Sequence, residues 1–547
     1  MKKLLIPILI LFVTSARSQG GYLIPGENEW LLNRLEIKAD SGTMRFSSIK
    51  PYNRRYLVAA VEAAEASAKN LSTVDRLNIE QFLAVNSEWS GHRASFLSRK
   101  PVLKHLYRSK VNALEVEQPG FHLVFNPMIQ YQQYKEDNNS ENVFLNSRGI
   151  QARGLIDRRI GFSFYFTENQ ERTPRYVNQW VDRFNAVPGV GYFKRFKNTN
   201  TAYDYFDTRA SVSWKVASFV DMQLAYDRNF TGNGYRSLFL SDFSNNYTFL
   251  KVLWHSSRFR YQNIFAELFP FHLPTSDRVY PRKYFRAHYL DFAAAKWLNL
   301  GLFEGTMTGR DKLHAGLFNP VMYLHFPSRK NKIEERSYLG FDLKANFFKR
   351  LQLYGQLLVD KLNTSGLADK TWDNRFGYQA GLKYVDVFGV RNLDLQIETN
   401  RVRPYTYAAD DSMTSYTHYN QPLAHPLGAN FEEYILIIRA QPHQKWCLQA
   451  KLIAYVQGLD LVGYNMGSNP FGGFGNRLSD VRVRVGDGDR ATCVMGSMLA
   501  SFELRPNIFI DASYTRRNYE TLIMKESNTS FMSIGFRWNM ARREFDF

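Results

Sequence analysis

The residues best suited to chemistry lie between Tyr405 and Tyr434. Within this stretch, the run YTHYNQPLAHPLGANFEEY combines aromatic rings with amide, imidazole and carboxylate groups. Rings stack on the C–H faces of sugars, and amides and carboxylates hydrogen-bond to hydroxyl groups, so the composition suits carbohydrate. The alternative is a rigid loop that folds into the interior of the surrounding structure and blocks it. The candidate contact residues are Tyr405, Tyr407, Tyr416, His418, Tyr419, His425, Asn430 and Glu432.

A second polar feature is Glu304, in the run GLFEGT, which is followed by Leu317-Phe318-Asn319-Pro320. The carboxylate is the one charge in an otherwise uncharged strand end. We expect it to face inward and to pair with an arginine or lysine. Ligand binding at this position is the alternative.

Templates for catalysis are absent from the sequence. It has no dinucleotide or phosphate-binding glycine loop, no zinc-protease helix motif and no nucleophile elbow. Asp487-Gly488-Asp489 lacks the downstream glutamate of a calcium loop, and the eleven histidines are scattered. We therefore expect no enzyme, no cofactor and no metal, although folding could still bring together a Ser–His pair.

The elements that must position these residues are short alternating strands from about residue 120 onward. In 341–347, Phe, Leu, Ala and Phe alternate with Asp, Lys and Asn, which gives a strand one apolar and one polar face. At about 24 residues per strand and loop, residues 119–547 predict a transmembrane antiparallel β-barrel of about 18 strands. A two-layered soluble sandwich is the competing fold. The expected long loops are 137–147, 172–201, 231–246, 405–430 and 463–489.

The N-terminus predicts export. Lys2 and Lys3 precede an apolar run, 4–13, and Ala16-Arg17-Ser18 has the form of a cleavage site. Residues 1–18 are therefore expected to be a signal peptide. No later run is long and apolar enough for a membrane helix, which excludes a helical membrane protein. The barrel prediction then places the chain in the outer membrane of a Gram-negative bacterium.

Composition supports the barrel and suggests the partners. Aromatic residues make up 15% of the chain, as aromatic girdles at the two membrane interfaces would require. The net charge of +19 favours polyanions such as acidic polysaccharide or lipopolysaccharide phosphates, and export makes nucleic acid the least favoured partner. A basic lumen or rim explains the charge equally well. Cys447 and Cys493 are predicted to be isolated strand residues.

Residues 19–118 are predicted to form a periplasmic helical domain. Helical spacing of apolar residues occurs in 27–39 and 53–69, and Ser72-Thr73-Val74-Asp75 resembles the start of a third helix. Three short helices bury little surface alone, so their apolar faces need a partner. This domain could also bind periplasmic or motility-machinery proteins.

The other end of the chain gives an ambiguous signal. Met532, Ile534, Phe536 and Trp538 alternate cleanly, but Phe545 and Phe547 resume out of phase. Either the last strand ends near Met540 and a tail follows, or a bulge shifts the register.

The chain resembles the capsule assembly Wzi family of outer-membrane proteins, in particular the Bacteroidetes branch that includes the gliding-motility protein RemB. The resemblance rests on Lys50-Pro51-Tyr52, Ser87-Glu88-Trp89, Asn319-Pro320 and 425–430. It implies an 18-stranded barrel that is closed by a helical bundle and by folded loops, and that acts as a lectin for capsule or exopolysaccharide. A transport channel and a barrel hydrolase remain the alternatives.

Overall fold

The computed structural model describes residues 22, 28–39, 44–91, 96–98, 106–157, 159–196, 199–270, 281–309, 315–324, 335–523 and 526–547. The expected signal peptide lies outside these residues. Among the described residues, no helix combines the length and apolarity needed to cross a bilayer.

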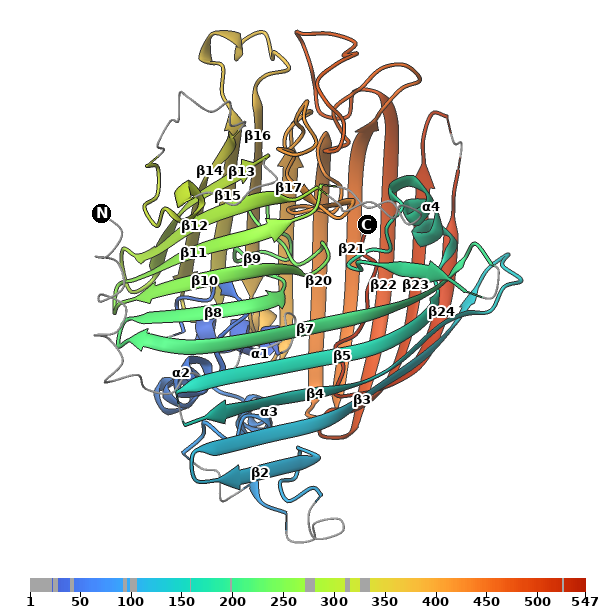
Figure 1. The fold of residues 1–547 in the computed structure, drawn as a ribbon. Coiled ribbons are helices and arrows are strands. Elements are labelled where there is room, and N and C mark those ends of the chain that lie inside the picture. Colours follow the sequence, from blue (N-terminus) through green and yellow to red (C-terminus); the bar gives the residue numbers. More distant parts are fainter. Residues whose placement is uncertain are drawn as a thin grey trace.

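Eighteen antiparallel strands form a closed barrel, as the sequence predicts (Figure 1). Closure comes from pairing of the last strand with the first long one, β24 with β3. In chain order the barrel strands are β3 (Phe121–Glu136), β4 (Val143–Ile156), β5 (Ile160–Arg172), β7 (Ala202–Ala217), β8 (Val220–Asp227), β10 (Tyr247–His255), β11 (Phe259–Leu268), β12 (Lys283–Ala293), β13 (Leu298–Thr308), β14 (Glu335–Phe347), β15 (Leu351–Lys361), β16 (Arg375–Tyr384), β17 (Leu393–Val402), β20 (Phe431–His443), β21 (Trp446–Leu459), β22 (Asp489–Arg505), β23 (Ile508–Glu520) and β24 (Thr529–Trp538).

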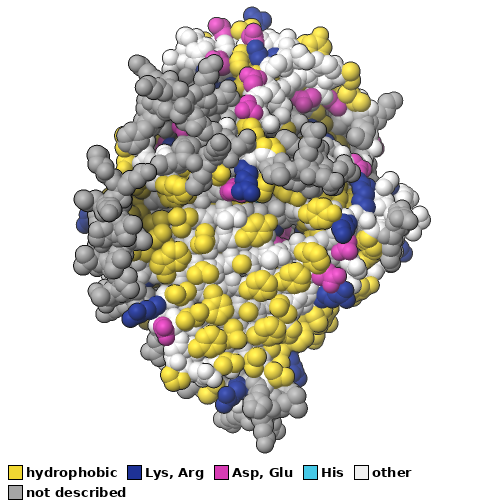
Figure 2. Space-filling view, in the orientation of Figure 1, with side chains coloured by type: hydrophobic (Ala, Val, Ile, Leu, Met, Phe, Trp, Pro, Cys, Tyr) yellow, Lys and Arg dark blue, Asp and Glu magenta, His cyan; other side chains and the backbone are white. Residues whose placement is uncertain are grey.

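The wall is apolar outside and polar inside. On β15, Leu353 and Leu357 are exposed, whereas Gln352 and Gln356, each one residue earlier, are buried toward the lumen. Figure 2 shows the exposed apolar side chains as a broad band over the wall strands, with charged side chains mostly above and below it. This arrangement suits a barrel surrounded by lipid and does not suit a soluble sandwich.

The two mouths of the barrel differ. Short turns such as 218–219, 348–350 and 506–507 lie at one end, which we call the inner mouth. The long connections lie at the other end, the outer mouth, and several contain small elements. These are α4 (Arg175–Phe184), β6 (Phe193–Arg195), β9 (Phe230–Thr231), η3 (Ala315–Phe318), η4 (Thr364–Gly366), β18 (Thr417–His418) and β19 (Gln421–Pro422); η5 (Val387–Gly389) lies in an inner turn.

Three helices sit inside the inner mouth: α1 (Glu29–Lys38), α2 (Arg54–Ser67) and α3 (Thr73–Val85) (Figure 1). Their boundaries follow the sequence signals. The Asn53 side chain caps α2, and Ser72 with Asp75 forms a capping box on α3. The helices bury a shared apolar core that includes Leu35, Val61 and Phe82.

Two short β-elements link the helical domain to the barrel. β1 (Ile49–Lys50) pairs with β9, which belongs to an outer-mouth connection that reaches into the lumen. β2 (Leu114–Gln118) pairs with β3 and leads the chain into the wall.

Candidate functional site

Ion pairs hold the helical domain in the inner mouth. Arg34, on α1, is 1% exposed and contacts Asp75 on α3 as well as Asp386 and Asp394 of the barrel. Lys38 joins the same network through Asp75 and Asp386, at 2.8 and 2.7 Å. Burial alone would raise the pKa of Asp75, but hydrogen bonds and charge from Arg34 and Lys38 lower it to about 2. The domain is therefore docked by buried charges.

The connection 403–430 fills the lumen below the outer mouth. The rings of Tyr407 and Tyr416 stack at 5.5 Å, and both are buried in the main apolar cluster of the lumen. Their hydroxyl groups donate hydrogen bonds of 2.7 and 2.6 Å to the carbonyl oxygens of Leu238 and Phe239. The two connections, 403–430 and 228–246, thus pack against each other inside the barrel.

The two histidines of this connection are also buried. His418 accepts a hydrogen bond from the Phe269 backbone N–H and lies 3.1 Å from the Asn246 carbonyl oxygen. Burial lowers the pKa of His418 to about 3. His425 accepts from the Leu427 N–H, and its Nε2 lies 2.8 Å from a Glu433 carboxylate oxygen. Burial lowers the pKa of His425, and the Glu433 charge opposes that shift.

Asn430 and Tyr405, two further candidates from the sequence, contact residues outside their own connection. Asn430 is buried, and its amide donates to backbone carbonyls that include those of Gly458 and Met466. Tyr405 is buried near Trp372, with ring centroids 5.9 Å apart.

Of the eight candidates, only Tyr419 and Glu432 keep partly exposed side chains. Glu432 lies near the outer rim beside Arg401 and accepts from the hydroxyl of Tyr434, which is 55% exposed on the wall. The eight residues therefore do not converge on one cleft. Most of them pack the segment that crosses the lumen.

A second lumen segment is the tail 539–547. The last strand ends at Trp538, so of the two alternatives left open by the sequence the structure has a tail rather than a bulge, and the tail turns back into the barrel (Figure 1). Arg543 makes two 2.9 Å contacts with the carboxylate of Glu171. Lys451 pairs with both Glu544 and Asp546.

The far end of the tail is held by aromatic rings. Phe547 packs against Tyr176 and Trp180 of α4 and against Phe243. The out-of-phase aromatics in the sequence were the one local signal that the tail leaves the sheet. Its partners lie hundreds of residues away, so sequence reasoning could not place it.

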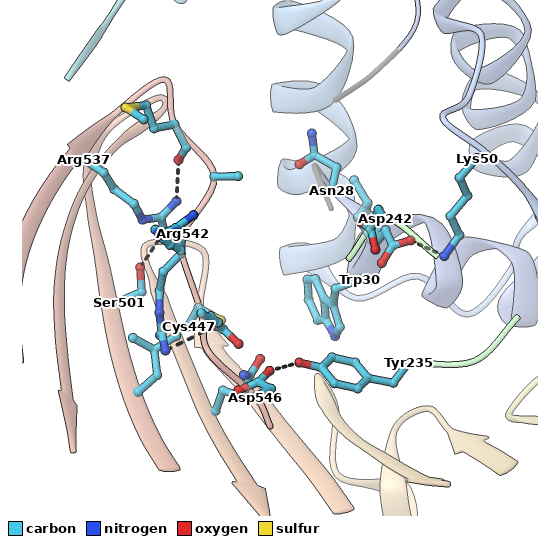
Figure 3. A pocket seen from close by; sticks show the side chains of 18 of the residues that line it. Asn28, Trp30, Lys50, Tyr235, Asp242, Cys447, Ser501, Arg537, Arg542 and Asp546 are labelled. Atoms are coloured by element: carbon cyan, nitrogen blue, oxygen red, sulfur yellow. Dashed lines mark hydrogen bonds and ion pairs between the residues drawn. The ribbon is translucent and has the colours of Figure 1, made fainter. Parts of the chain in front are cut away.

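Between the helices, the tail and the wall lies a cavity of about 800 Å³ (Figure 3). Figure 3 shows Trp30 on the helical side, and Ser501, Arg537 and Arg542 on the opposite side. Lysine and arginine outnumber aspartate and glutamate among its described lining residues. Arg439 reaches over the Trp30 ring at 4.5 Å. The cavity is polar and carries an excess of positive charge.

One expectation about a polar residue is wrong. Glu304 does not face the lumen: it alternates with Leu302, which is 38% exposed on the outer wall, while the intervening Phe303 is buried inside. The Glu304 carboxylate instead accepts a 2.6 Å hydrogen bond from the backbone N–H of Tyr323, which belongs to the connection between β13 and β14 at the outer mouth.

The described residues contain no group of three or more histidine, cysteine or acidic side chains placed to hold a metal ion. Both cysteines are free thiols, and Cys447 lines the cavity.

Together these features define a class: an outer-membrane-type β-barrel whose lumen is crossed by a helical domain, two long connections and a tail. No family model matches the chain, and no curated protein matches it. Among solved structures it is similar to Wzi of Escherichia coli, described as a carbohydrate-binding β-barrel involved in group 1 capsule assembly. That match has a TM-score of 0.56 and 12% identity, and it covers 96% of this chain and 100% of Wzi.

Weaker similarity extends to Pseudomonas aeruginosa OprD, with a TM-score of 0.41, 8% identity, and coverage of 76% of this chain and 94% of that one. OccK8 (OprE) of the same organism matches with a TM-score of 0.42 and 8% identity, and the match covers 76% of this chain and 97% of OccK8. At 12% identity the similarity to Wzi shows the fold alone: a closed 18-stranded barrel with an N-terminal plug-like helical segment.

Proposed function

We propose that this protein binds polysaccharide at the surface of the outer membrane and takes part in the attachment or assembly of capsule or exopolysaccharide. The observation that carries the proposal is the crossed lumen. The helical domain fills the inner mouth, and the connections 228–246 and 403–430 pack together below the outer mouth. A barrel built in this way suits binding better than free diffusion.

Two further points support the proposal. The fold matches a carbohydrate-binding barrel over nearly the whole of both chains. The net charge of +19 favours an acidic glycan or lipopolysaccharide phosphates as the partner. The proposal includes export by a signal peptide, residues 1–18, and a periplasmic position for the helical domain from residue 19 to about 118. It also includes a role like that of RemB in the Bacteroidetes branch, where the polysaccharide would serve gliding motility.

The eight residues chosen from the sequence enter the proposal in two roles. Tyr419 and Glu432 keep partly exposed side chains and can touch a glycan directly. The other six are buried, so their contribution is to hold the connection in shape. These are Tyr405, Tyr407, Tyr416, His418, His425 and Asn430.

The test is binding of the purified full-length protein, in detergent, to a polyuronic acid and to neutral dextran. We expect the polyuronate to bind at low ionic strength and to dissociate as salt rises, because screening weakens exposed charge pairs. Tyr419→Ala should weaken binding by about 3- to 10-fold, the loss expected from one aromatic contact of ~1 kcal/mol. Tyr378→Ala, a change on the lipid-facing wall, is the matched control. No binding of either polymer would refute the proposal.

A transport channel is the second candidate, and the cavity of about 800 Å³ is the observation that favours it. A polar, positively lined space inside the barrel could form part of a route for anions. Steady currents through the full-length protein in planar bilayers would favour the channel over the binding protein.

A further inference from the structure

The outward surface of β11, β12 and β13 carries a polar cluster where the neighbouring strands are apolar. Asn263, His288 and Glu304 are cross-strand neighbours in one row. The row continues into Val252 on one side and Leu339 on the other. Leu339 is 43% exposed, as a lipid-facing residue should be, whereas the three polar residues are fully buried.

The cover over this cluster is residues 316–324, which we call the strap. The Pro320 carbonyl oxygen accepts a 3.0 Å hydrogen bond from the Asn263 amide. The Tyr323 backbone N–H donates to Glu304 at 2.6 Å. The strap therefore leaves the outer mouth and folds back against the outside of the wall, and its backbone supplies partners for the polar cluster.

One further hydrogen bond and one aromatic contact hold the strap against the wall. Arg286, one step along β12 from His288 on the same face, donates to the Gly316 carbonyl oxygen at 2.8 Å. Phe318 packs on the outward ring of Phe265, with centroids 5.4 Å apart. The strap is thus bound by polar and apolar contacts to β11 and β12.

The strap also satisfies part of its own backbone. The Asn319 side chain accepts from the Val321 N–H at 3.0 Å and donates to the Leu324 carbonyl oxygen at 2.6 Å. In hydrocarbon there is no water to pair with free backbone groups, so an irregular segment can lie there only if protein supplies the partners.

The outer surface of the strap is apolar. Its exposed large apolar residues are Phe318, Val321, Tyr323 and Leu324, which are 42–51% exposed. They replace the polar surface of the row beneath with a surface like that of the adjoining wall, where Leu302 and Phe341 are exposed to a similar degree. The apolar band would be broken at β11–β13 without this cover.

We propose that the strap is a lipid-facing interaction surface: it lies within the membrane on the outside of the barrel and presents apolar side chains to the acyl chains of the outer leaflet. The polar cluster anchors it there. The proposal commits to lipid as the occupant because the strap is continuous with the apolar band of the wall. It requires that the barrel spans the membrane, and it stands or falls independently of glycan binding.

Depth measurement tests this placement directly. A nitroxide label at Val321→Cys in proteoliposomes should collide readily with oxygen and poorly with a water-soluble nickel complex. Leu339→Cys on the wall is the lipid-facing control, and Val462→Cys, 92% exposed in an outer connection, is the aqueous control. The native thiols are first replaced by Cys447→Ser and Cys493→Ala.

A label at position 321 that behaves like the one at 462 would overturn the proposal. Shielding from both oxygen and nickel would also overturn it, because a second copy or another protein would then cover the strap. Neither outcome would bear on polysaccharide binding.

A second measurement tests the anchoring role. Replacing 316–324 by a glycine–serine linker of equal length should lower the melting temperature of the barrel in lipid, because the polar cluster then meets hydrocarbon. Adding Asn263→Leu, His288→Leu and Glu304→Leu to the linker variant should restore most of the loss. If the linker variant alone melts like the native protein, the strap does not shield the cluster from lipid.

Discussion

At the scale of single residues, the lumen of this barrel is organised by buried charges and by neutral histidines. Arg34 is the clearest case, because it contacts three carboxylates from two parts of the fold. Removing one partner of a buried charge network leaves the others uncompensated, which is strongly destabilising.

Arg34→Met should therefore weaken docking of the helical domain by about 3–5 kcal/mol. Hydrogen exchange of α1–α3 should rise, while the barrel keeps its heat-modifiable migration in gels. Arg76→Met, an exposed change on α3, is the matched control. Unchanged protection of the helices in Arg34→Met would show that the ion pairs do not hold the domain.

The connection 403–430 should loosen in acid because of His418. Its pKa is lowered to about 3 in the folded protein from 6.5, so the unfolded chain binds the proton more readily. The contribution of neutral His418 to the stability of this connection is complete above about pH 6.5 and is lost as the pH falls toward 3.

Hydrogen exchange of 403–430 as a function of pH measures this loss. His418→Gln should flatten the profile over that range, and His443→Gln, at the exposed inner end of β20, should leave it unchanged. A profile for His418→Gln that matches the native protein would assign the acid sensitivity to other groups.

At the scale of elements, the tail and the strap show that segments next to strands need not extend the sheet. The tail 539–547 turns into the lumen because its charges find buried partners such as Glu171 and Lys451 there. The strap turns outward because the wall beneath it is polar. Each segment therefore supplies polar partners for buried side chains of the wall: the tail does so inside the lumen, and the strap does so on the outside.

Removal of 541–547 should open the cavity. Cys447 lines that cavity and reports on access to it. We expect a bulky, charged maleimide to label Cys447 at least several-fold faster in the truncated protein, and Cys447→Ser to abolish the reaction. Equal labelling rates with and without the tail would mean that the tail does not control entry.

At the scale of the whole molecule, different segments fill the lumen at its two mouths. The helical domain fills the inner mouth, and the connections and the tail cross the lumen above it. Hydrogen bonds and ion pairs join these parts to the wall and to one another, so the helices, the connections, the tail and the wall form one connected unit.

The full-length protein should therefore give no large steady current in planar bilayers. Deleting residues 28–113, the part of the helical domain that contains α1–α3, together with 541–547 should produce such currents, and either deletion alone should produce less. Large currents from the intact protein would contradict a plugged lumen and support the channel.

The local pattern of the sequence was enough to predict much of the fold. Alternation with period 2 predicted the wall strands, such as β14, where 341–347 alternates as in the sequence. The apolar spacing in 53–69 predicted α2, and the pattern Ser72–Asp75 predicted where α3 begins. These features depend on residues close together in the chain, so they can be recognised without the tertiary structure.

Tertiary structure decided what covers each face. Period 2 separates the two faces of β13, but it could not show that Glu304 lies outward beneath a strap rather than inward beside a cation. Nor could it show that Tyr407 and Tyr416 pack the lumen instead of lining an open cleft. Such contacts join residues that are far apart in the chain, and their partners are fixed only when the barrel closes.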